Sequence, residues 1–322
     1  MQTPKVSIVI PAYYAANYLA EAIDSALAQT YSDIEIIVVN DGSRDDGETE
    51  RIALSYGDKI RYVRKENGGS SSALNAGIAC MTGEWFSWLS HDDLYAPNKI
   101  QRQIEYLATL DVEPTDLSKQ VVFSSVEWID GNGGVLRPFR EKAERRLSER
   151  VASFPHNGYL IAEPTVFNFY GCSCLIHKSV FEAIGGFCEQ LRLINDMDMW
   201  YRLYKAGYRV HYIPEPLAKG RIHGKQISRS IGFSYANPEQ DMFWGRSLDW
   251  LMENHPENYE LFYRFGCNAY LKTRNSDGDR AFSRAMRLRP KAKVKLFCKK
   301  QYCKIYAAAR NSVKQIYLKI RV

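Results

Sequence analysis

Short apolar runs rich in β-branched residues alternate with amphipathic segments along the first part of the chain. Residues 6–10 form one run, which ends at Pro11, and residues 34–39 form a second, which ends in the turn residues 40–43. Between them, the apolar side chains of residues 17–30 fall on one helical face, with Asn17 as the expected N-cap. This order of strand, helix and strand predicts an α/β fold with a mainly parallel sheet flanked by helices.

The acidic residues of this region follow the predicted strands. A third strand is expected over residues 60–63, a helix over Ser70–Cys80 and a fourth strand over residues 85–89. Asp41 comes after the second strand, and Asp92 and Asp93 come after the fourth. Ligands of parallel α/β sheets bind at the carboxyl ends of the strands, where carboxylates can hold a divalent cation against an anionic ligand. The pattern therefore predicts a metal-assisted site at this edge.

The rest of the sequence predicts further strands and helices and a boundary between domains. Residues 111–165 contain a strand over residues 121–123 and a charged, solvated stretch over residues 137–150. Helices are expected from Ser179 and over Asn195–Lys205, and a domain boundary near residues 225–238. The expected domains are a catalytic domain over residues 1–230, a helical extension over 231–290 and a basic amphipathic tail over 291–322. Residues 269–290 resemble a single tetratricopeptide-type hairpin.

Charge is distributed very unevenly along the 322 residues. The formal net charge is +6, but residues 280–322 hold 14 Lys or Arg and no Asp or Glu, so this segment carries +14 and residues 1–279 carry −8. Apolar residues recur at helical spacing among these cations, which is typical of a helix that binds an anionic membrane surface. The alternatives are a helix packed on the acidic body and nucleic-acid binding, which no recognised nucleic-acid module supports.

Composition predicts an ordinary folded protein that needs no disulfide framework. The sequence is 45% hydrophobic and 25% charged, and its seven cysteines show no paired C-x-x-C spacing. We interpret the cysteines as reduced thiols, with Cys172 and Cys174 as packing residues rather than a metal pair. No signal peptide and no long apolar run is evident. The expected location is the cytoplasm, with a peripheral site on the cytoplasmic face of the membrane if the basic tail binds lipid.

Seven segments, in this order, resemble the nucleotide-sugar glycosyltransferases of family 2, whose catalytic domain has the GT-A fold. They are Val-Ser-Ile-Val-Ile-Pro-Ala-Tyr at 6–13, Ile-Val-Val-Asn-Asp-Gly-Ser at 37–43, Glu-Asn-Gly-Gly at 66–69 with Ala-Leu-Asn-Ala-Gly at 73–77, Trp-Leu-Ser-His-Asp-Asp at 88–93 with Pro97 and Lys99, Gly-Gly-Phe at 185–187, Asn195 and Asp196 with Trp200 and Arg202, and Arg-Ile-His at 221–223 with Ser228. Together they cover about residues 4–230.

The resemblance implies a role for each matching residue. Asp196 would be the general base, and Asp93 would ligate Mn²⁺ or Mg²⁺ together with His223. Asp92 would face the ribose and the diphosphate, and Asp41 would hydrogen-bond the base. Arg221 and His223 would lie in a loop that closes over the diphosphate. The donor-binding residues are then Pro11, Ala12, Tyr13, Asp41, Asn67, Gly68, Asn75, Asp92, Arg221 and His223.

Three positions depart from the commonest family pattern. Ser90 stands where many members have an acid, so only Asp92 and Asp93 remain for the metal and the ribose. Leu74 stands where many have an arginine, which removes one cation from the donor side. Asn195 replaces the first residue of the usual acidic pair, so only Asp196 carries charge there.

Each of these residues also has a purely structural interpretation. Asp92 and Asp93 could cap a helix that begins near Pro97, and Asp196 could cap its own helix, with Asp198 as a rival base. Asp41 could be a turn residue. Arg221 and His223 could be ordinary surface charges, and these alternatives stay open at the level of sequence.

The sequence thus predicts an inverting, metal-dependent glycosyltransferase of the hexosyl- or N-acetylhexosaminyl-transferase type. The donor would be a nucleotide sugar, with UDP as the expected nucleotide. The acceptor would be a saccharide or a lipid-linked saccharide in the assembly of surface polysaccharide or glycan. Two alternatives are a sugar-phosphate nucleotidyltransferase and a non-catalytic scaffold that binds a nucleotide sugar or a membrane. The first is disfavoured, because the first strand ends in Pro-Ala-Tyr-Tyr at 11–14 and not in a glycine-rich phosphate loop.

Overall fold

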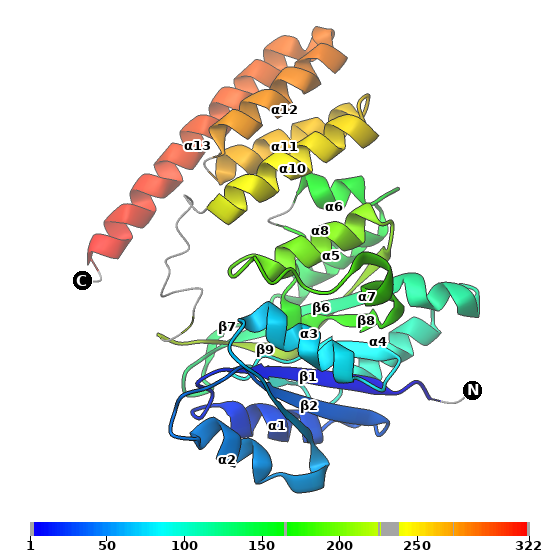
Figure 1. The fold of residues 1–322 in the computed structure, drawn as a ribbon. Helices are drawn as coiled ribbons and strands as arrows, with labels where there is room; N and C mark the ends of the chain where they lie inside the picture. Colours follow the sequence, from blue (N-terminus) through cyan, green and yellow to red (C-terminus); the bar gives the residue numbers. More distant parts are fainter. Residues whose placement is uncertain (1–2, 164–165, 225, 227–237, 273, 321–322) are drawn as a thin grey trace. The chain divides into compact units, whose positions relative to one another are not determined.

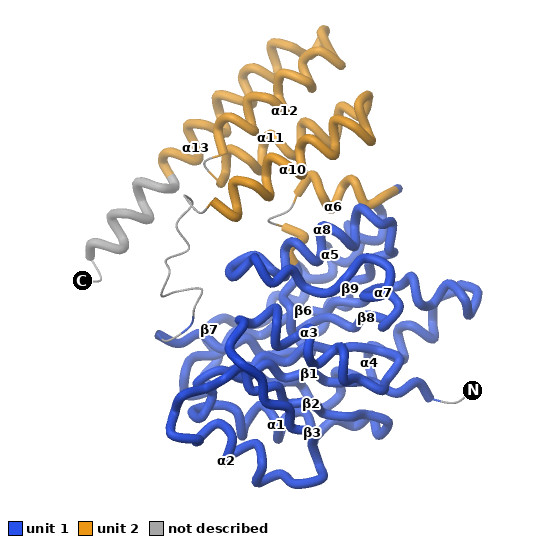
Figure 2. Tube along the Cα trace, viewed as in Figure 1, with its two compact units in different colours: residues 1–155, 169–230 blue, residues 156–168, 231–322 orange. Residues whose placement is uncertain are grey.

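The computed structural model describes residues 3–163, 166–224, 226, 238–272 and 274–320, with side chains described as far as residue 309. The chain divides into two compact units (Figure 2). Unit 1 is Met1–Pro155 with Phe169–Ser230, and unit 2 is His156–Asn168 with Ile231–Val322. Residues 156–168, assigned from sequence to the N-terminal domain, therefore group with the C-terminal helices. Ser228 and most of the predicted boundary at 225–238 lie outside the described residues.

Unit 1 is built from strands that alternate with helices (Figure 1). Its strands are β1 (Val6–Ala12), β2 (Ile34–Asn40), β3 (Arg61–Arg64), β4 (Trp85–Trp88), β5 (Leu94–Tyr95), β6 (Gln120–Asp130), β7 (Val135–Arg137), β8 (Leu175–His177) and β9 (Arg209–Ile222). Its α-helices are α1 (Leu19–Leu27), α2 (Glu48–Leu54), α3 (Ser70–Cys80), α4 (Lys99–Ala108), α5 (Glu141–Ala152), α7 (Ser179–Ile184) and α8 (Asn195–Lys205).

Within the described residues, the strands form one mixed sheet in the order β3-β2-β1-β4-β8-β6-β9-β5, with β7 beside β6. The β3-β2-β1-β4 half is parallel, as is the long β6/β9 pair. Strand β8 is antiparallel to both β4 and β6 and joins the two halves. The predicted α/β architecture is confirmed, and the antiparallel insertion is the part that local sequence did not reveal.

One local prediction was wrong. Asn17 is not the cap of α1, because the helix begins at Leu19 behind Tyr18 and no side chain caps it. The charged stretch at 137–150 is solvated as expected, and it contains most of helix α5. Its Ser148 hydroxyl donates to the carbonyl of Tyr212, at 2.7 Å, and so ties α5 to β9. Tertiary contact therefore orders a segment whose own apolar content is low.

Unit 2 contains helices α6 (Gly158–Ala162), α10 (Pro238–Asn254), α11 (Tyr259–Leu271), α12 (Asn275–Leu288) and α13 (Lys293–Ile320). Helices α11 and α12 pack against each other, and α6 packs on α10 and α11. Its core includes Trp244, Phe262, Phe265 and Phe282, all almost fully buried. No helix within the described part of the chain is long and apolar enough to cross a bilayer.

Candidate functional site

Register places the carboxyl ends of four parallel strands at one edge of the sheet. Ala12 pairs with Asn40, Asn40 pairs with Arg64, and Val9 pairs with Trp88. The residues that follow the strands keep this alignment, since the Asp41 amide donates to the Ala12 carbonyl at 2.8 Å. The edge predicted from sequence is therefore present, and the chain segments that follow β1, β2, β3 and β4 meet there.

Asp41 is buried, and its carboxylate organises the loop between β3 and α3. One oxygen accepts from the Lys65 ammonium at 2.8 Å and from the Gly68 amide at 3.0 Å. The other accepts from the Gly69 amide at 2.7 Å and from the Asn67 side chain at 3.3 Å. Asn67 and Gly68, predicted to bind the nucleotide-sugar donor, thus lie against Asp41. The Asp41 carboxylate already accepts hydrogen bonds from four groups of the protein.

Gly42 allows this loop to lie close to the end of β2. Its φ of +71° belongs to the left-handed region, and an added Cβ would lie 2.7 Å from the backbone nitrogen of Asn67. Any other residue at 42 would both strain the backbone and push the loop away. Sequence reasoning overlooked Lys65, whose charge balances the buried Asp41 carboxylate.

Asn75, a predicted donor-binding residue, connects α3 to the segment before α8. Its amide nitrogen donates to the Phe187 carbonyl and to Glu189, both at 2.9 Å, and its oxygen accepts from the Phe187 amide at 2.8 Å. A Cβ on Gly186 would lie only 2.3 Å from the Asn75 oxygen. The structure therefore gives Asn75 a positioning contact between two elements of the site.

The end of β1 combines buried and exposed groups. Ala12 is buried, as is Pro11 beside it, whereas the side chains of Tyr13 and Tyr14 are 40% and 50% exposed. The two tyrosine rings meet edge to face with centroids 4.7 Å apart, and Tyr14 has a positive φ of 49°. An exposed aromatic pair directly after the strand is suited to contact a planar base.

Asp92 and His223 meet although they are far apart in sequence. The Nε2 atom of His223 lies 3.0 Å from Oδ2 of Asp92, and the Gln226 amide donates to the same oxygen at 3.3 Å. The Asp92 and His223 side chains keep 15% and 14% of their surface accessible. A carboxylate and an imidazole in contact at a strand end form a donor set that a divalent cation can use.

Asp93 is completely buried and its oxygens are occupied by the protein. One oxygen accepts from the Arg221 amide at 2.8 Å, and the other accepts from the Tyr170 hydroxyl at 2.7 Å and the Cys172 thiol at 3.0 Å. Burial, helped by the nearby Asp92 charge, raises the pKa of Asp93 to about 7. These contacts enclose Asp93, and its role as a metal ligand stays a prediction from sequence.

Arg221 is also buried, with 1% of its surface exposed, and does not form part of an open loop. Its guanidinium donates to the Asp92 carbonyl at 2.8 Å, to the Gly131 carbonyl at 3.1 Å and to Glu21 at 2.7 Å. It also stacks over the ring of Tyr18 at 4.4 Å. Arg221 therefore holds the backbone of the Asp92 turn in place from the end of β9.

The two candidate bases on α8 have different environments. Asp198 is paired with Arg202 at 2.8 Å, and Arg202 also donates to the carbonyls of Ile184, Gly185 and Gly186. Asp196 accepts a hydrogen bond from the Met197 amide at 2.7 Å. Burial raises the pKa of Asp196 to about 6. A carboxylate with that pKa can take up a proton near neutral pH, whereas Asp198 has a structural partner.

Helix α8 is anchored to the rest of the site through these same contacts. Arg202 holds the carbonyls of residues 184–186, and Asn75 holds Phe187 from α3. The side-chain nitrogen of Asn195, next to Asp196, is buried and has no hydrogen-bond partner among the residues that the structure describes. Helices α3 and α8 are thus coupled through their polar contacts with residues 184–187, which fixes Asp196 relative to α3.

A metal ion would need ligands beyond those that the protein supplies. Within the described residues, no group of three or more His, Cys, Asp or Glu side chains is arranged to hold an ion. Mg²⁺ commonly takes one or two protein carboxylates and completes its shell with substrate phosphates and water. Asp92 fits that mode as a carboxylate that keeps part of its surface accessible, with His223 beside it.

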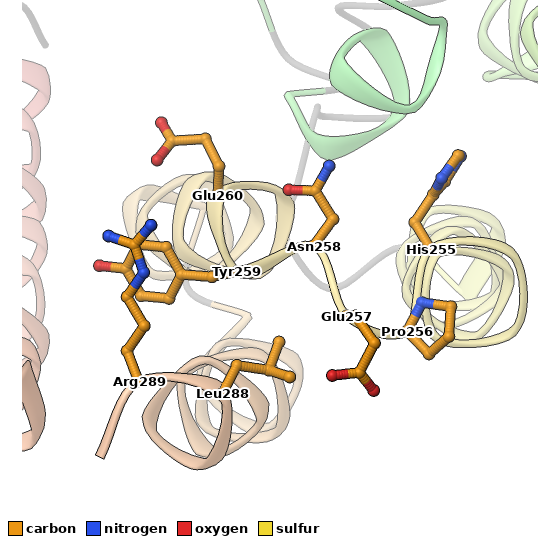
Figure 3. Close-up of a pocket in the computed structure, with 8 residues that line it drawn as sticks. All are labelled: His255, Pro256, Glu257, Asn258, Tyr259, Glu260, Leu288 and Arg289. Carbon is orange, nitrogen blue, oxygen red and sulfur yellow. The ribbon is translucent and has the colours of Figure 1, made fainter. Parts of the chain in front are cut away.

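Unit 2 carries an open pocket of about 630 Å³ (Figure 3). It is lined by His255, Pro256, Glu257, Asn258, Tyr259, Glu260, Leu288 and Arg289. Arg289 stacks on Tyr259 at 4.2 Å, and the pocket mixes acids and bases without a buried ionisable cluster. The candidate active site is therefore the strand edge of unit 1.

Besides Lys65, sequence reasoning missed three side chains of this edge. Glu21 pairs with Arg221 from helix α1, Tyr170 donates to Asp93, and Gln226 donates to Asp92. Gln226 lies three residues after His223, so its proximity was the one available local signal. Glu21 and Tyr170 come from segments that the fold alone brings to Arg221 and Asp93.

Known proteins resemble this chain in sequence, and others resemble it in fold. A Rickettsia felis protein named as an uncharacterized glycosyltransferase is 46% identical over 251 residues, which are 78% of this chain and 39% of that protein. A Rickettsia prowazekii protein with the same kind of name is 47% identical over 231 residues, covering 71% of this chain and 67% of its own length. This chain spans less than half of the R. felis relative.

The fold matches solved structures of S. aureus TarS. The crystal structure of TarS residues 1–349 in complex with UDP-GlcNAc aligns with a TM-score of 0.63 at 14% identity, over 97% of this chain and 92% of that one. The predicted GT-A-type fold with a helical C-terminal segment is confirmed by this likeness. The model of glycosyl transferase family 2 matches residues 7–185, so Asp196, Arg221 and His223 lie beyond the matched range. Because that match covers more than half of the sequence, the chain belongs to glycosyl transferase family 2.

Proposed function

We propose that this protein transfers a sugar from a nucleoside diphosphate donor to a hydroxyl acceptor with inversion at the anomeric carbon. The observation that carries the proposal is the contact of Asp92 with His223, 3.0 Å apart, at the carboxyl edge of a family 2 fold. The acceptor oxygen forms a bond to the anomeric carbon while the bond from that carbon to the diphosphate oxygen breaks. A single displacement of this kind inverts the anomeric configuration.

Asp196 is the general base in this proposal. Its carboxylate takes the acceptor hydroxyl proton as the new bond forms, an effect typically worth about 10²- to 10⁴-fold in rate. The raised pKa, about 6, supports this role, and so does the commitment of the rival Asp198 to Arg202. The diphosphate leaves on the opposite side of the sugar from Asp196.

Asp92 and His223 are the residues that would hold Mn²⁺ or Mg²⁺. A bound divalent cation supplies Lewis-acid stabilisation of the charge that develops on the diphosphate. We assign Asp93, expected from sequence to be the metal ligand, to a positioning role, because Tyr170, Cys172 and the Arg221 amide occupy its oxygens. Arg221 positions the same turn, and both residues act through Asp92.

The donor end of the site is formed by the residues after β1 and β3. Tyr13 is exposed beside Pro11 and Ala12, which suits a nucleoside pocket. Asp41, whose carboxylate shapes the loop of Asn67 and Gly68, acts as a positioning residue there. UDP-GlcNAc is the first donor to test, because TarS, which shares the fold, has been crystallised with it. A saccharide or lipid-linked saccharide acceptor in surface polysaccharide or glycan assembly, met at the cytoplasmic face of a membrane, remains our working expectation.

The direct experiment measures release of nucleoside diphosphate from a panel of nucleotide sugars, with Mn²⁺ or Mg²⁺ and then with EDTA. We expect turnover of one donor class, stimulation by the cation and loss with EDTA. Asp92→Asn and His223→Ala should each weaken cation stimulation at least tenfold, since each removes one of the two protein ligands. Asp116→Asn, on the exposed η2 turn (Pro114–Lys119), is the matched control and should leave turnover unchanged.

Two results would contradict the proposal. If nucleotide sugars are bound but none is turned over, the chain is a scaffold and not a transferase. If Asp92→Asn and His223→Ala keep full cation stimulation, the metal lies elsewhere.

A further inference from the structure

Helix α13 of unit 2 is buried along one side. Leu296, Cys303 and Ala307 are at most 7% exposed, and the helix packs on α11 and α12 (Figures 1 and 2). Lys300 and Lys304 both pair with Asp279 of α12. These contacts fix which face of α13 points away from its own unit.

The opposite side of α13 is also apolar, and it is exposed. Val294 is 78% exposed, Phe297 53% and Ile305 69%, and the exposed Cys298 lies between them along the helix. At about 100° per residue, these four side chains lie within one third of the helix circumference, on the side away from Leu296 and Cys303. Exposed large apolar residues gathered in one stripe mark an interaction surface.

Two exposed aromatic residues extend this stripe. Tyr302 and Tyr306 are 57% and 49% exposed, and their rings stack with centroids 6.0 Å apart. Tyrosine has an apolar body and a polar tip, a combination suited to the boundary between water and lipid. The stripe is therefore apolar at its centre and amphipathic along one edge.

Lysines lie on both flanks of the stripe. Lys293 is on one side with Lys300 and Lys304, and Lys295 is on the other with Lys299, which stacks over Tyr302 at 4.9 Å. Lys293 and Lys295 are exposed, and residues 280–322 contain no Asp or Glu. The face thus combines apolar groups at its centre with positive charge at its edges.

We propose that the face formed by Val294, Phe297, Cys298, Tyr302, Ile305 and Tyr306 binds the surface of a membrane that contains anionic lipids. The apolar side chains enter the boundary between headgroups and acyl chains, and the exposed Lys293 and Lys295 contact the anionic headgroups. A second copy of the chain fits less well, because a symmetric contact through this face would bring the exposed lysines of the two copies together, and residues 280–322 hold no acid to pair with them.

The test is flotation of the full chain with vesicles, which requires no sugar transfer and is therefore independent of the proposed activity. One set of vesicles is phosphatidylcholine with a third of phosphatidylserine, and the other is phosphatidylcholine alone. We expect binding to the anionic vesicles to be at least tenfold stronger and to fall with added salt, because the charge contribution is screened.

Variants separate the apolar stripe from the lysines. Phe297→Asp with Ile305→Asp should reduce vesicle binding at least tenfold, and so should Lys293→Glu with Lys295→Glu. Leu54→Asp is the matched control, since Leu54 is 56% exposed on α2 of unit 1, and it should bind like the unchanged protein. Far-UV circular dichroism checks that each variant folds.

A second measurement leaves the helix sequence intact. A polarity-sensitive fluorophore on Cys298 should shift to the blue with anionic vesicles, and a Cys298→Ser protein treated in the same way gives the background. Binding that is equal on both vesicle types, absent altogether, or unchanged in the Phe297 and Ile305 variant would overturn the proposal. Concentration-dependent dimers that disappear in that variant, without vesicle binding, would assign the face to a second copy.

Discussion

Asp196 and Asp198 lie two residues apart on one helix, and their partners distinguish them. Asp198 is fixed by Arg202, which also holds three backbone carbonyls before the helix. Asp196 is half-buried, has no such ion pair among the described residues, and has the raised pKa of about 6. Sequence left these two acids as rivals, and the choice follows from the long-range contacts of Arg202.

Asp196→Asn should abolish most of the transfer activity while leaving donor binding intact. The amide cannot accept the acceptor proton, so we expect kcat to fall by about 10²- to 10⁴-fold. Steady-state kinetics and donor titration by calorimetry measure the two quantities separately. Asp198→Asn should instead lower thermal stability, because it breaks the pair with Arg202. An equal loss of donor affinity and kcat in Asp196→Asn would indicate a structural role.

The pKa of Asp196 also predicts two pH dependences. Transfer should decline as pH falls below about 6, where the base becomes protonated. Because burial raises this pKa above the usual 3.8, protonated Asp196 favours the folded state, and that stabilisation is lost as pH rises from about 4 through about 6. Asp196→Asn should therefore raise the unfolding temperature at pH 7 and change it little at pH 4. Calorimetric scans at both values test this, and an unchanged unfolding temperature at pH 7 would contradict it.

Asp41→Ala should destabilise unit 1. It removes the acceptor for Lys65 and for the amides of Gly68 and Gly69, and we expect a loss of about 2–4 kcal/mol in the free energy of unfolding. Urea unfolding followed by circular dichroism measures it. Glu113→Ala, at an exposed position whose side chain makes no cap hydrogen bond to η2, should change stability by less than about 0.5 kcal/mol. If Asp41→Ala lowers the free energy of unfolding as little as Glu113→Ala does, the loop does not depend on this carboxylate.

At the scale of elements, helix α3 lies unusually close to strand β1. Gly77 makes this possible, since an added Cβ would lie 2.2 Å from a methyl carbon of Val9. The small residues of 70–80 predicted this helix from sequence, and its bounds are as expected. The sequence did not show that Gly77 is the small residue that contacts β1, because that depends on how the helix packs on the strand.

Gly77→Ala should lower stability although alanine is the better helix former. The overpacking against Val9 should cost about 1–3 kcal/mol. Gly245→Ala is the matched opposite, because Gly245 also lies inside a helix, α10, but has nothing within 4 Å of an added Cβ. That change should stabilise unit 2 by roughly 1 kcal/mol. Thermal unfolding of both variants decides the matter, and shifts of the same sign would refute the packing argument.

At the scale of the whole molecule, the two units are not consecutive stretches of chain. Residues 156–168 belong to unit 2, where Leu160 and Ile161 are 2% exposed and Glu163 pairs with Arg264 of α11 at 2.6 Å. A cut at residue 230, natural from sequence, therefore separates α6 from the helices that bury it.

A fragment of residues 1–230 should be poorly soluble or bind a hydrophobic dye. Without unit 2, the side chains of Leu160 and Ile161 become exposed, and each loses about 1.5–3 kcal/mol of stabilising free energy from burial. A fragment of residues 1–290 keeps α10, α11 and α12 and is the control. Soluble yield and dye fluorescence compare the two, and equal behaviour would show that α6 does not need its partners.

Local pattern by itself determined the alternation of strands and helices, the edge at which acids gather and the separation of charge along the chain. These properties depend on residues close in sequence, whose periodicity and turn chemistry act locally. Only the tertiary structure decided that Asp92 meets His223, 131 positions away, while Asp93 is enclosed, and that residues 156–168 join the C-terminal helices. Burial and pairing of a carboxylate depend on segments that the fold brings together from distant parts of the chain, which no local pattern encodes.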